Sequence, residues 1–123
     1  MTTRTFAAAA AGFGRDLDED FATIATLLEQ ARAAGADLLS LPEAALGGYL
    51  SSLHDDPDDV PPQLDVDGPE IARLVALAGH TVVTAGFCER GDAASGGRPY
   101  NSAVAVTGDG VLGHHRKVHQ PLN

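Results

Sequence analysis

The chain has 123 residues, of which 44% are hydrophobic and only 5% are aromatic. This length and apolar content fit a single compact unit, whose core we expect to consist mainly of Ala, Val, Leu and Ile. The formal net charge of -9 argues against nucleic acid and anionic membranes as partners.

The first part of the chain predicts two strands joined by a helix. Residues 4–11 are apolar without helical periodicity and predict a buried strand. Residues 18–34 place apolar side chains at helical spacing and acids at the start, and Gly35 stands where a left-handed cap belongs. Residues 36–41 form a second short apolar run, which Pro42 ends because proline cannot donate to a ladder.

A long polar stretch and a second helix follow. Residues 44–68 are rich in Gly, Pro and Asp, a composition typical of a solvated loop. Residues 69–78 begin with Pro and Glu, carry one apolar face and end at Gly79, so they predict a helix.

The rest of the chain predicts strands. Residues 81–88 are apolar and β-branched, and the runs 100–107 and 111–117 are joined by the turn 108–110 as a hairpin. Two short crossovers imply right-handed βαβ units with parallel neighbouring strands. We therefore expect an α/β fold: a mixed sheet, with an antiparallel addition, that carries both helices on one face.

Glu43 stands just past the second predicted strand. Active sites of open α/β sheets lie at the carboxyl ends of the strands, so this carboxylate is a candidate general base. The alternative is an acid at a strand end that makes only a surface hydrogen bond.

Lys117 closes the second arm of the hairpin and is the only lysine in the chain. A lysine on a rigid strand can offer a positive charge to an oxyanion that forms at a carbonyl or imidate carbon. The alternative is a solvated basic strand end.

Three histidines and one cysteine are weaker candidates. On a strand His115 and His119 point to one face and His114 to the other, so they do not converge on a metal, and we expect none. Cys88 is the only cysteine, which excludes an intrachain disulfide and agrees with a reducing cytoplasm. It ends an apolar strand beside Glu89, which would raise its pKa, so we interpret it as structural. The glycines lack phosphate-cradle and dinucleotide spacing.

The candidate residues lie in segments that together resemble the nitrilase superfamily of carbon–nitrogen hydrolases. The segments are AAGADLLSLPE with GY at 33–49, AGF with Glu89 at 85–89, YNSAV at 100–104 and GHHRKVH at 113–119. The resemblance implies an α-β-β-α sandwich, of which residues 1–123 form the N-terminal part of one hydrolase domain that stops before the nucleophilic Cys.

The resemblance also implies roles for residues. Glu43 matches the family's general base and Lys117 the residue that stabilises the tetrahedral intermediate, whereas Cys88 matches no part of the nucleophile motif. The implied reaction is hydrolysis of a small amide, nitrile or carbamoyl compound, without a cofactor or metal, in a homo-oligomer. The alternative is a non-catalytic fragment or interaction module with the same fold.

Overall fold

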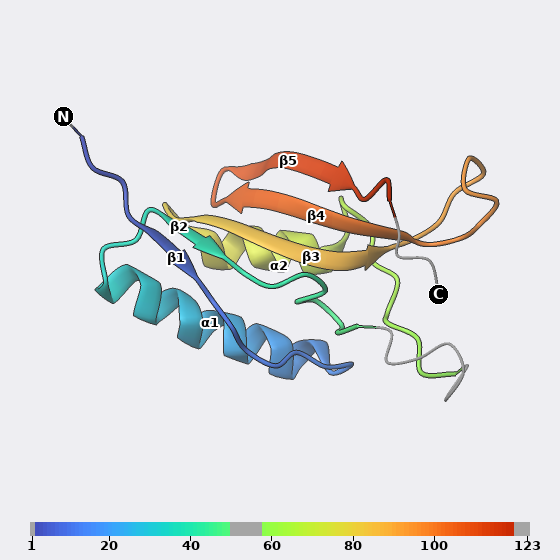
Figure 1. Cartoon of the computed structure of the whole chain (residues 1–123), viewed down its shortest axis with the longest axis horizontal. Helices are drawn as coiled ribbons and strands as arrows, with labels where there is room; N and C mark the ends of the chain where they lie inside the picture. Colours follow the sequence, from blue (N-terminus) through green and yellow to red (C-terminus); the bar gives the residue numbers. More distant parts are fainter. Residues whose placement is uncertain (1, 50–57, 120–123) are drawn as a thin grey trace.

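The computed structural model describes residues 2–49 and 58–119. Its elements are β1 (Phe6–Ala8), α1 (Leu17–Ala33), β2 (Leu38–Ser40), α2 (Pro69–Ala78), β3 (Val82–Glu89), β4 (Tyr100–Thr107) and β5 (Gly110–Arg116). The strands form one sheet in the order β1-β2-β3-β4-β5 (Figure 1). β1, β2 and β3 are parallel, and β4 and β5 are each antiparallel to the strand before them, which confirms the mixed α/β sheet.

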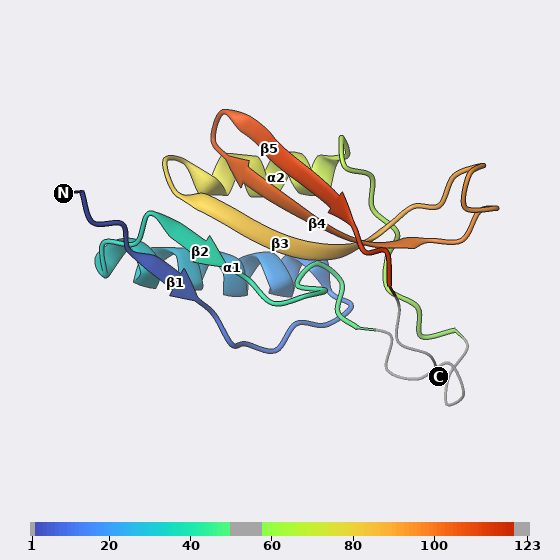
Figure 2. The same ribbon diagram turned by 45° about the horizontal axis from the view of Figure 1, so that its top comes forward.

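Both helices lie on the same face of the sheet. Figure 2 shows α1 and α2 behind the five strands, and the two helices contact each other. Because each helix links two parallel strands that are neighbours in the sheet, right-handed crossovers place them on one side. In the described part of the chain, no helix covers the opposite face.

The ends of α1 follow from the sequence. The Asp16 side chain caps the N-terminus by accepting hydrogen bonds from the amides of Asp18 and Glu19. At the other end Gly35 adopts a φ of 73°, the left-handed conformation that the sequence predicts there. α2 likewise begins with Pro69 and stops at Gly79.

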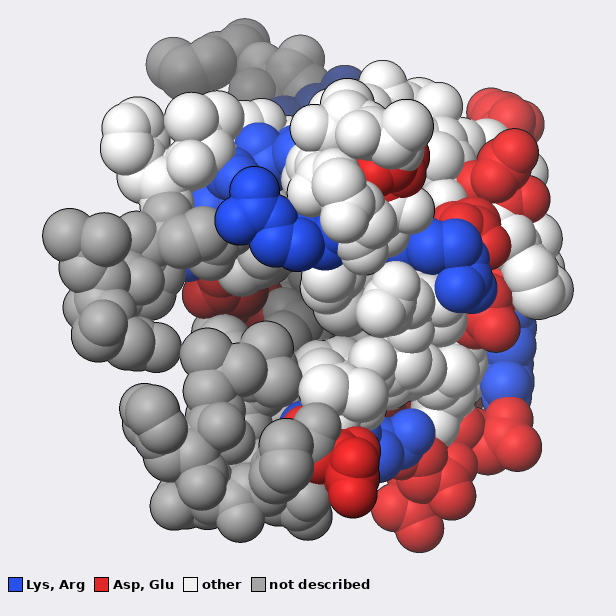
Figure 3. All heavy atoms as spheres, turned by 90° about the vertical axis from the view of Figure 1, so that its right-hand side faces the viewer, with Lys and Arg blue, Asp and Glu red and all other residues white. Residues whose placement is uncertain are grey.

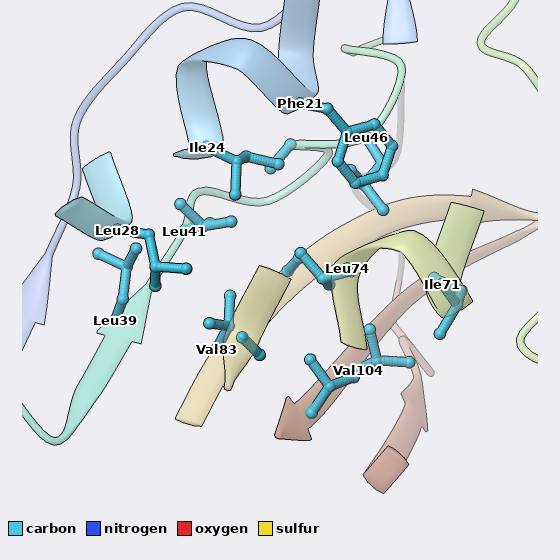
Figure 4. Packing of buried hydrophobic residues seen from close by; sticks show 14 of the residues in the cluster. Phe21, Ile24, Leu28, Leu39, Leu41, Leu46, Ile71, Leu74, Val83 and Val104 are labelled. Atoms are coloured by element: carbon cyan, nitrogen blue, oxygen red, sulfur yellow. The ribbon is translucent and has the colours of Figure 1, made fainter. Parts of the chain in front are cut away.

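The core lies between the helices and the sheet. Figure 4 shows Leu28 of α1 and Leu74 of α2 directed toward Leu39 and Val83 of the central strands. Each of these four side chains is at most 2% exposed. Along β3 and β4, buried positions largely alternate with partly buried ones, so the face under the helices is dry and the opposite face is more accessible.

The prediction that the first strand is buried is wrong. β1 is the edge of the sheet, and Phe6 is 71% exposed. The strand spans three residues rather than the predicted 4–11. An apolar run does not reveal whether both faces of the strand are covered; here Ala7 packs against the core, whereas Phe6 and Ala8 are exposed on the other face.

The prediction of a solvated loop over 44–68 is also wrong at both ends of that stretch. Ala45 and Leu46 are fully buried, and Leu64 is 4% exposed. The amides of Leu46 and Leu64 donate to carbonyls of β3, at 3.0 Å to Gly86 and 2.8 Å to Cys88. The middle of the predicted loop, 50–57, lies outside the described residues.

Over 2–49 and 58–119, neither helix is long and apolar enough to cross a membrane.

Truncation of a core side chain tests the packing. Leu74→Ala should lower the free energy of unfolding by about 2–5 kcal/mol, because Leu74 is fully buried between α2 and the sheet. Leu112→Ala is the matched control, since Leu112 on β5 is 60% exposed, and it should change stability by less than about 0.5 kcal/mol. Urea unfolding monitored by circular dichroism measures both, and equal losses would contradict this account of the core.

Candidate active site

The site forms where the parallel strands end. β5 runs antiparallel to β4, and β4 antiparallel to β3, so β2, β3 and β5 run in the same direction. Their carboxyl ends therefore lie together along one edge of the sheet. Glu43 follows β2, and Lys117 directly follows β5. Figure 3 shows the molecule from this edge, where basic side chains cross the face with acidic side chains beside them. The edge therefore carries charges of both signs rather than a patch of one sign.

Glu43 and Lys117 are in direct contact. The Nζ of Lys117 donates to Oε1 of Glu43 at 2.9 Å, and each side chain is 39% exposed. Two neutral donors complete the set: Nδ2 of Asn101 lies 2.7 Å from Oε1, and the hydroxyl of Tyr49 lies 2.8 Å from Oε2. The carboxylate thus accepts hydrogen bonds at both oxygens, and residues 74 positions apart meet at one point.

These donors stabilise the ionised form of Glu43. The hydrogen bond from Lys117, followed by those from Tyr49 and Asn101, lowers the pKa of Glu43 from 4.5 to about 2 against a smaller opposing effect of burial. The same contact raises the pKa of Tyr49, because ionised Tyr49 would face a carboxylate. Glu43 is therefore an anion at neutral pH.

Gly86 allows the backbone after β2 to lie against β3. A Cβ at Gly86 would come within 2.5 Å of the Ala44 amide nitrogen and 3.0 Å of the Glu43 Cα. Ala44 itself has a φ of 57°, a conformation that costs a non-glycine residue roughly 1–2 kcal/mol. Close approach to a strand and a strained turn together fix the direction in which Glu43 leaves the sheet.

The segment that carries Tyr49 is tied to the start of α1. Arg15 donates to the carbonyls of Gly47, at 2.6 Å, and Tyr49, at 2.5 Å. The buried carboxylate of Asp20 accepts the amide of Gly47 at 2.9 Å. The donor that Tyr49 offers to Glu43 is therefore held by residues far away in sequence.

A pocket of about 310 Å³ lies beside this network on the face opposite the helices. Glu43 and Lys117 both line it, together with Thr84, Asn101 and His115. The charged pair thus borders a space large enough for a small compound, with polar side chains around it.

Sequence reasoning did not assign roles to Tyr49, Asn101 or Gly86. Asn101 stands in an alternating strand, and its side chain faces Glu43 only because β4 pairs with β3 in the observed register. The proximity of Gly86 to Glu43 depends on the pairing of β2 with β3. When the strand pairing is not known, the sequence gives no sign that Asn101 or Gly86 lies close to Glu43.

His114 and His115 lie on opposite faces of β5, as strand geometry predicts. His114 contacts Glu89 at 2.9 Å on the helix-covered face, whereas His115 lines the pocket on the other face. Within 2–49 and 58–119, no group of three or more His, Cys, Asp or Glu side chains is placed to hold a metal ion.

One explanation for Cys88 requires correction. Its pKa is raised, but the cause is burial, opposed weakly by Arg15, and not the neighbouring Glu89. Adjacent residues of a strand point to opposite faces, and Glu89 is directed toward Ser102 and Arg116. Cys88 remains a half-buried thiol that is disfavoured as thiolate.

The electrostatics of the pair predict a pH effect. Because the pKa of Glu43 is lowered in the folded state, its contribution to stability is present above about 4.5 and is lost as the pH falls through about 2. We expect a ¹³C NMR titration of the Glu43 carboxyl to give a midpoint near 2. In Lys117→Met the midpoint should move toward 4.5, and an unchanged midpoint would contradict the contact.

Comparison with known proteins identifies the family and agrees with the fold. The family model "Carbon-nitrogen hydrolase" matches residues 6–122. A search of curated proteins found no match. Among solved structures, a carbon-nitrogen hydrolase from Helicobacter pylori G27 is 24% identical with a TM-score of 0.74, over 98% of this chain and 41% of that one.

Two further structures share the fold. A glutamine-dependent NAD+ synthetase from Acinetobacter baumannii is 22% identical with a TM-score of 0.74, over 98% of this chain and 22% of that one. An amidase from Nesterenkonia sp. is 18% identical with a TM-score of 0.72, over 98% and 44%. The chain thus spans less than half the length of these structures. With the family model matched over nearly all of its length, the chain belongs to the carbon-nitrogen hydrolase family.

Proposed function

We propose that the complete protein hydrolyses a non-peptide carbon–nitrogen bond in a small amide, nitrile or carbamoyl compound. Glu43 is the general base and Lys117 the electrostatic stabiliser. The observation that carries the proposal is the 2.9 Å contact between these two side chains, which both line the pocket, in a chain of this family. An ionised carboxylate and an ammonium around one space are the groups that covalent attack on an amide-like carbon requires.

In the proposed reaction, Glu43 accepts the proton of a cysteine thiol and the thiolate attacks the substrate carbon. Lys117 then stabilises the negative charge that develops on the substrate oxygen or nitrogen. With an amide or carbamoyl compound, the proton passes from Glu43 to the leaving ammonia or amine, and the acyl group remains on the cysteine as a thioester. With a nitrile, the proton passes to the nitrile nitrogen and gives a thioimidate; a first water adds to this carbon and ammonia leaves, so that the same thioester remains. Water, deprotonated by the same carboxylate, finally hydrolyses the thioester and restores the thiol.

The low pKa of Glu43 has a consequence for this sequence of steps. A carboxylate that accepts three donors binds a proton weakly, which disfavours transfer from a thiol. When Lys117 turns its charge toward the forming oxyanion, Glu43 loses the donor that lowers its pKa most. Base strength and oxyanion stabilisation are therefore coupled through one hydrogen bond.

The proposed nucleophile is a cysteine outside these 123 residues. Cys88 is a poor candidate because burial raises its pKa, and it is not among the described residues that line the pocket. We also propose that the complete protein is cytoplasmic and homo-oligomeric, the latter because the family's sandwiches commonly pair through their helical layers.

Removal of either charge tests the proposal in the complete protein. Glu43→Gln keeps the shape of the side chain but removes the base, and Lys117→Met removes the charge but keeps most of the length. Each should lower kcat/KM by about 100-fold to 10,000-fold, and the two losses should not add. Release of ammonia from a panel of small amides and nitriles measures the rate.

The matched control is Glu29→Gln, which removes the same charge from an exposed position on α1. Its rate should equal that of the unmodified protein. A folded Glu43→Gln variant with near-normal turnover would defeat the assignment of the base. An unmodified protein that hydrolyses none of the compounds would support a non-catalytic module.

The role of Cys88 is tested separately. Cys88→Ala in the complete protein should leave turnover within about twofold of normal, because a thiol disfavoured as thiolate does not supply the nucleophile. Loss of activity in a Cys88→Ala variant that unfolds at the normal denaturant concentration would reverse this assignment.

A further inference from the structure

The strand that carries Lys117 has no buried residue to hold it in place. β5 is the last strand of the sheet (Figure 1). Six of its seven residues are exposed. None of its residues belongs to the buried hydrophobic core, and the contact with the core comes from His114, whose ring stacks on that of Phe87 with the centroids 6.4 Å apart. An edge strand of this kind depends on its backbone ladder and on polar contacts. The position of Lys117 therefore depends on what fixes the end of β5.

Arg116, the residue before Lys117, is fixed by Glu89. Its Nη2 donates to Oε1 of Glu89 at 2.7 Å and its Nε to Oε2 at 3.0 Å, a two-pronged contact that sets both distance and orientation. The guanidinium also lies over the ring of Tyr100, 4.0 Å from the centroid. Arg116 is thus the most firmly held side chain of β5.

Glu89 is itself rigidly placed. It ends β3, is 4% exposed, and also accepts a hydrogen bond from the hydroxyl of Ser102 and contacts Nε2 of His114 at 2.9 Å. Burial alone would raise the pKa of Glu89, but the hydrogen bonds from Arg116, Ser102 and His114 lower it to about 2. A buried anion at this point joins the ends of β3, β4 and β5 on the helix-covered face.

Arg116 and Lys117 point to opposite faces, as neighbours in an extended chain do. The amide of Lys117 donates to the carbonyl of Asn101 at 2.8 Å, so the pairing with β4 continues through Lys117. The side chain of Asn101 in turn donates to Glu43. A shift of Arg116 would therefore move Lys117 relative to both partners.

We propose that Glu89 is a positioning residue for the Glu43–Lys117 pair: it holds Arg116 on the helix-covered face and thereby fixes Lys117 against Glu43 on the opposite face. Its effect on catalysis rests on the function proposed above. Its effect on the contact between the two side chains does not.

The test is the pKa of the Glu43 carboxyl in Glu89→Gln, measured by ¹³C NMR on the 123-residue chain. Loss of the negative charge of Glu89 would by itself lower the pKa of Glu43, because one carboxylate no longer repels the other. Release of Lys117 from Glu43 has the opposite effect, because it removes a donor that lowers the pKa of Glu43. It should raise that pKa from about 2 by about one unit or more. The direction of the change therefore separates positioning from a direct effect of charge.

Three further variants sharpen the result. Arg116→Lys keeps the charge but cannot make the two-pronged contact, and it should also raise the pKa of Glu43. Asp65→Asn breaks the exposed pair with Arg90, and Leu74→Ala weakens the core away from the site. Neither should change the pKa of Glu43.

A double variant shows whether Glu89 acts on Glu43 through Lys117. In a Lys117→Met background, Glu89→Gln should not raise the pKa of Glu43 further, because the contact it positions is already absent. An unchanged or lowered pKa in folded Glu89→Gln, or an equal rise in Leu74→Ala, would overturn the proposal. If Glu89→Gln does not fold, Arg116→Lys decides in the same way. None of these measurements requires turnover, so their failure is distinct from failure of the proposed function.

Discussion

The hydrogen-bonded ion pair between Glu43 and Lys117 is the interaction on which the site depends. It joins the turn after β2 to the end of β5 across the two strands that lie between them. Parallel strands bring their carboxyl ends to one edge, and the antiparallel hairpin returns β5 to that edge. The fold therefore brings a negative and a positive charge together beside the pocket, on the face that the described helices leave uncovered.

At the carboxyl ends of the strands, each face of the sheet carries a charged pair with a different role. On one face, the buried carboxylate of Glu89 forms an ionic contact with the partly exposed Arg116, and this contact stabilises the ends of three strands. On the other, Glu43 and Lys117 are partly exposed beside a pocket. Arg116 and Lys117 are neighbours in sequence and point to opposite faces. One therefore belongs to the structural pair and the other to the proposed catalytic pair. A buried carboxylate such as Glu89 needs partners for its hydrogen bonds, whereas a reacting pair needs access to substrate.

The sequence predicted the elements well because their signals are local. The acids of the first turn and Gly35 mark α1, and Gly79 ends α2, without reference to the rest of the chain. The positions of Glu43 and Lys117 followed from strand ends, whereas their catalytic roles rest on the family resemblance. Long-range facts were not accessible: the exposure of Phe6 depends on which strand is the edge, and the role of Asn101 depends on register. A one-residue change in register would turn that amide away from Glu43.

The most direct test of the central claim is mass spectrometry of the complete protein mixed with a slowly hydrolysed amide. The account predicts an acyl adduct on a cysteine other than Cys88, formed equally well by Cys88→Ala and lost in Glu43→Gln. The adduct should disappear with hydroxylamine, as a thioester does. An adduct on Cys88, or adduct formation at an undiminished rate in Glu43→Gln, would contradict the account.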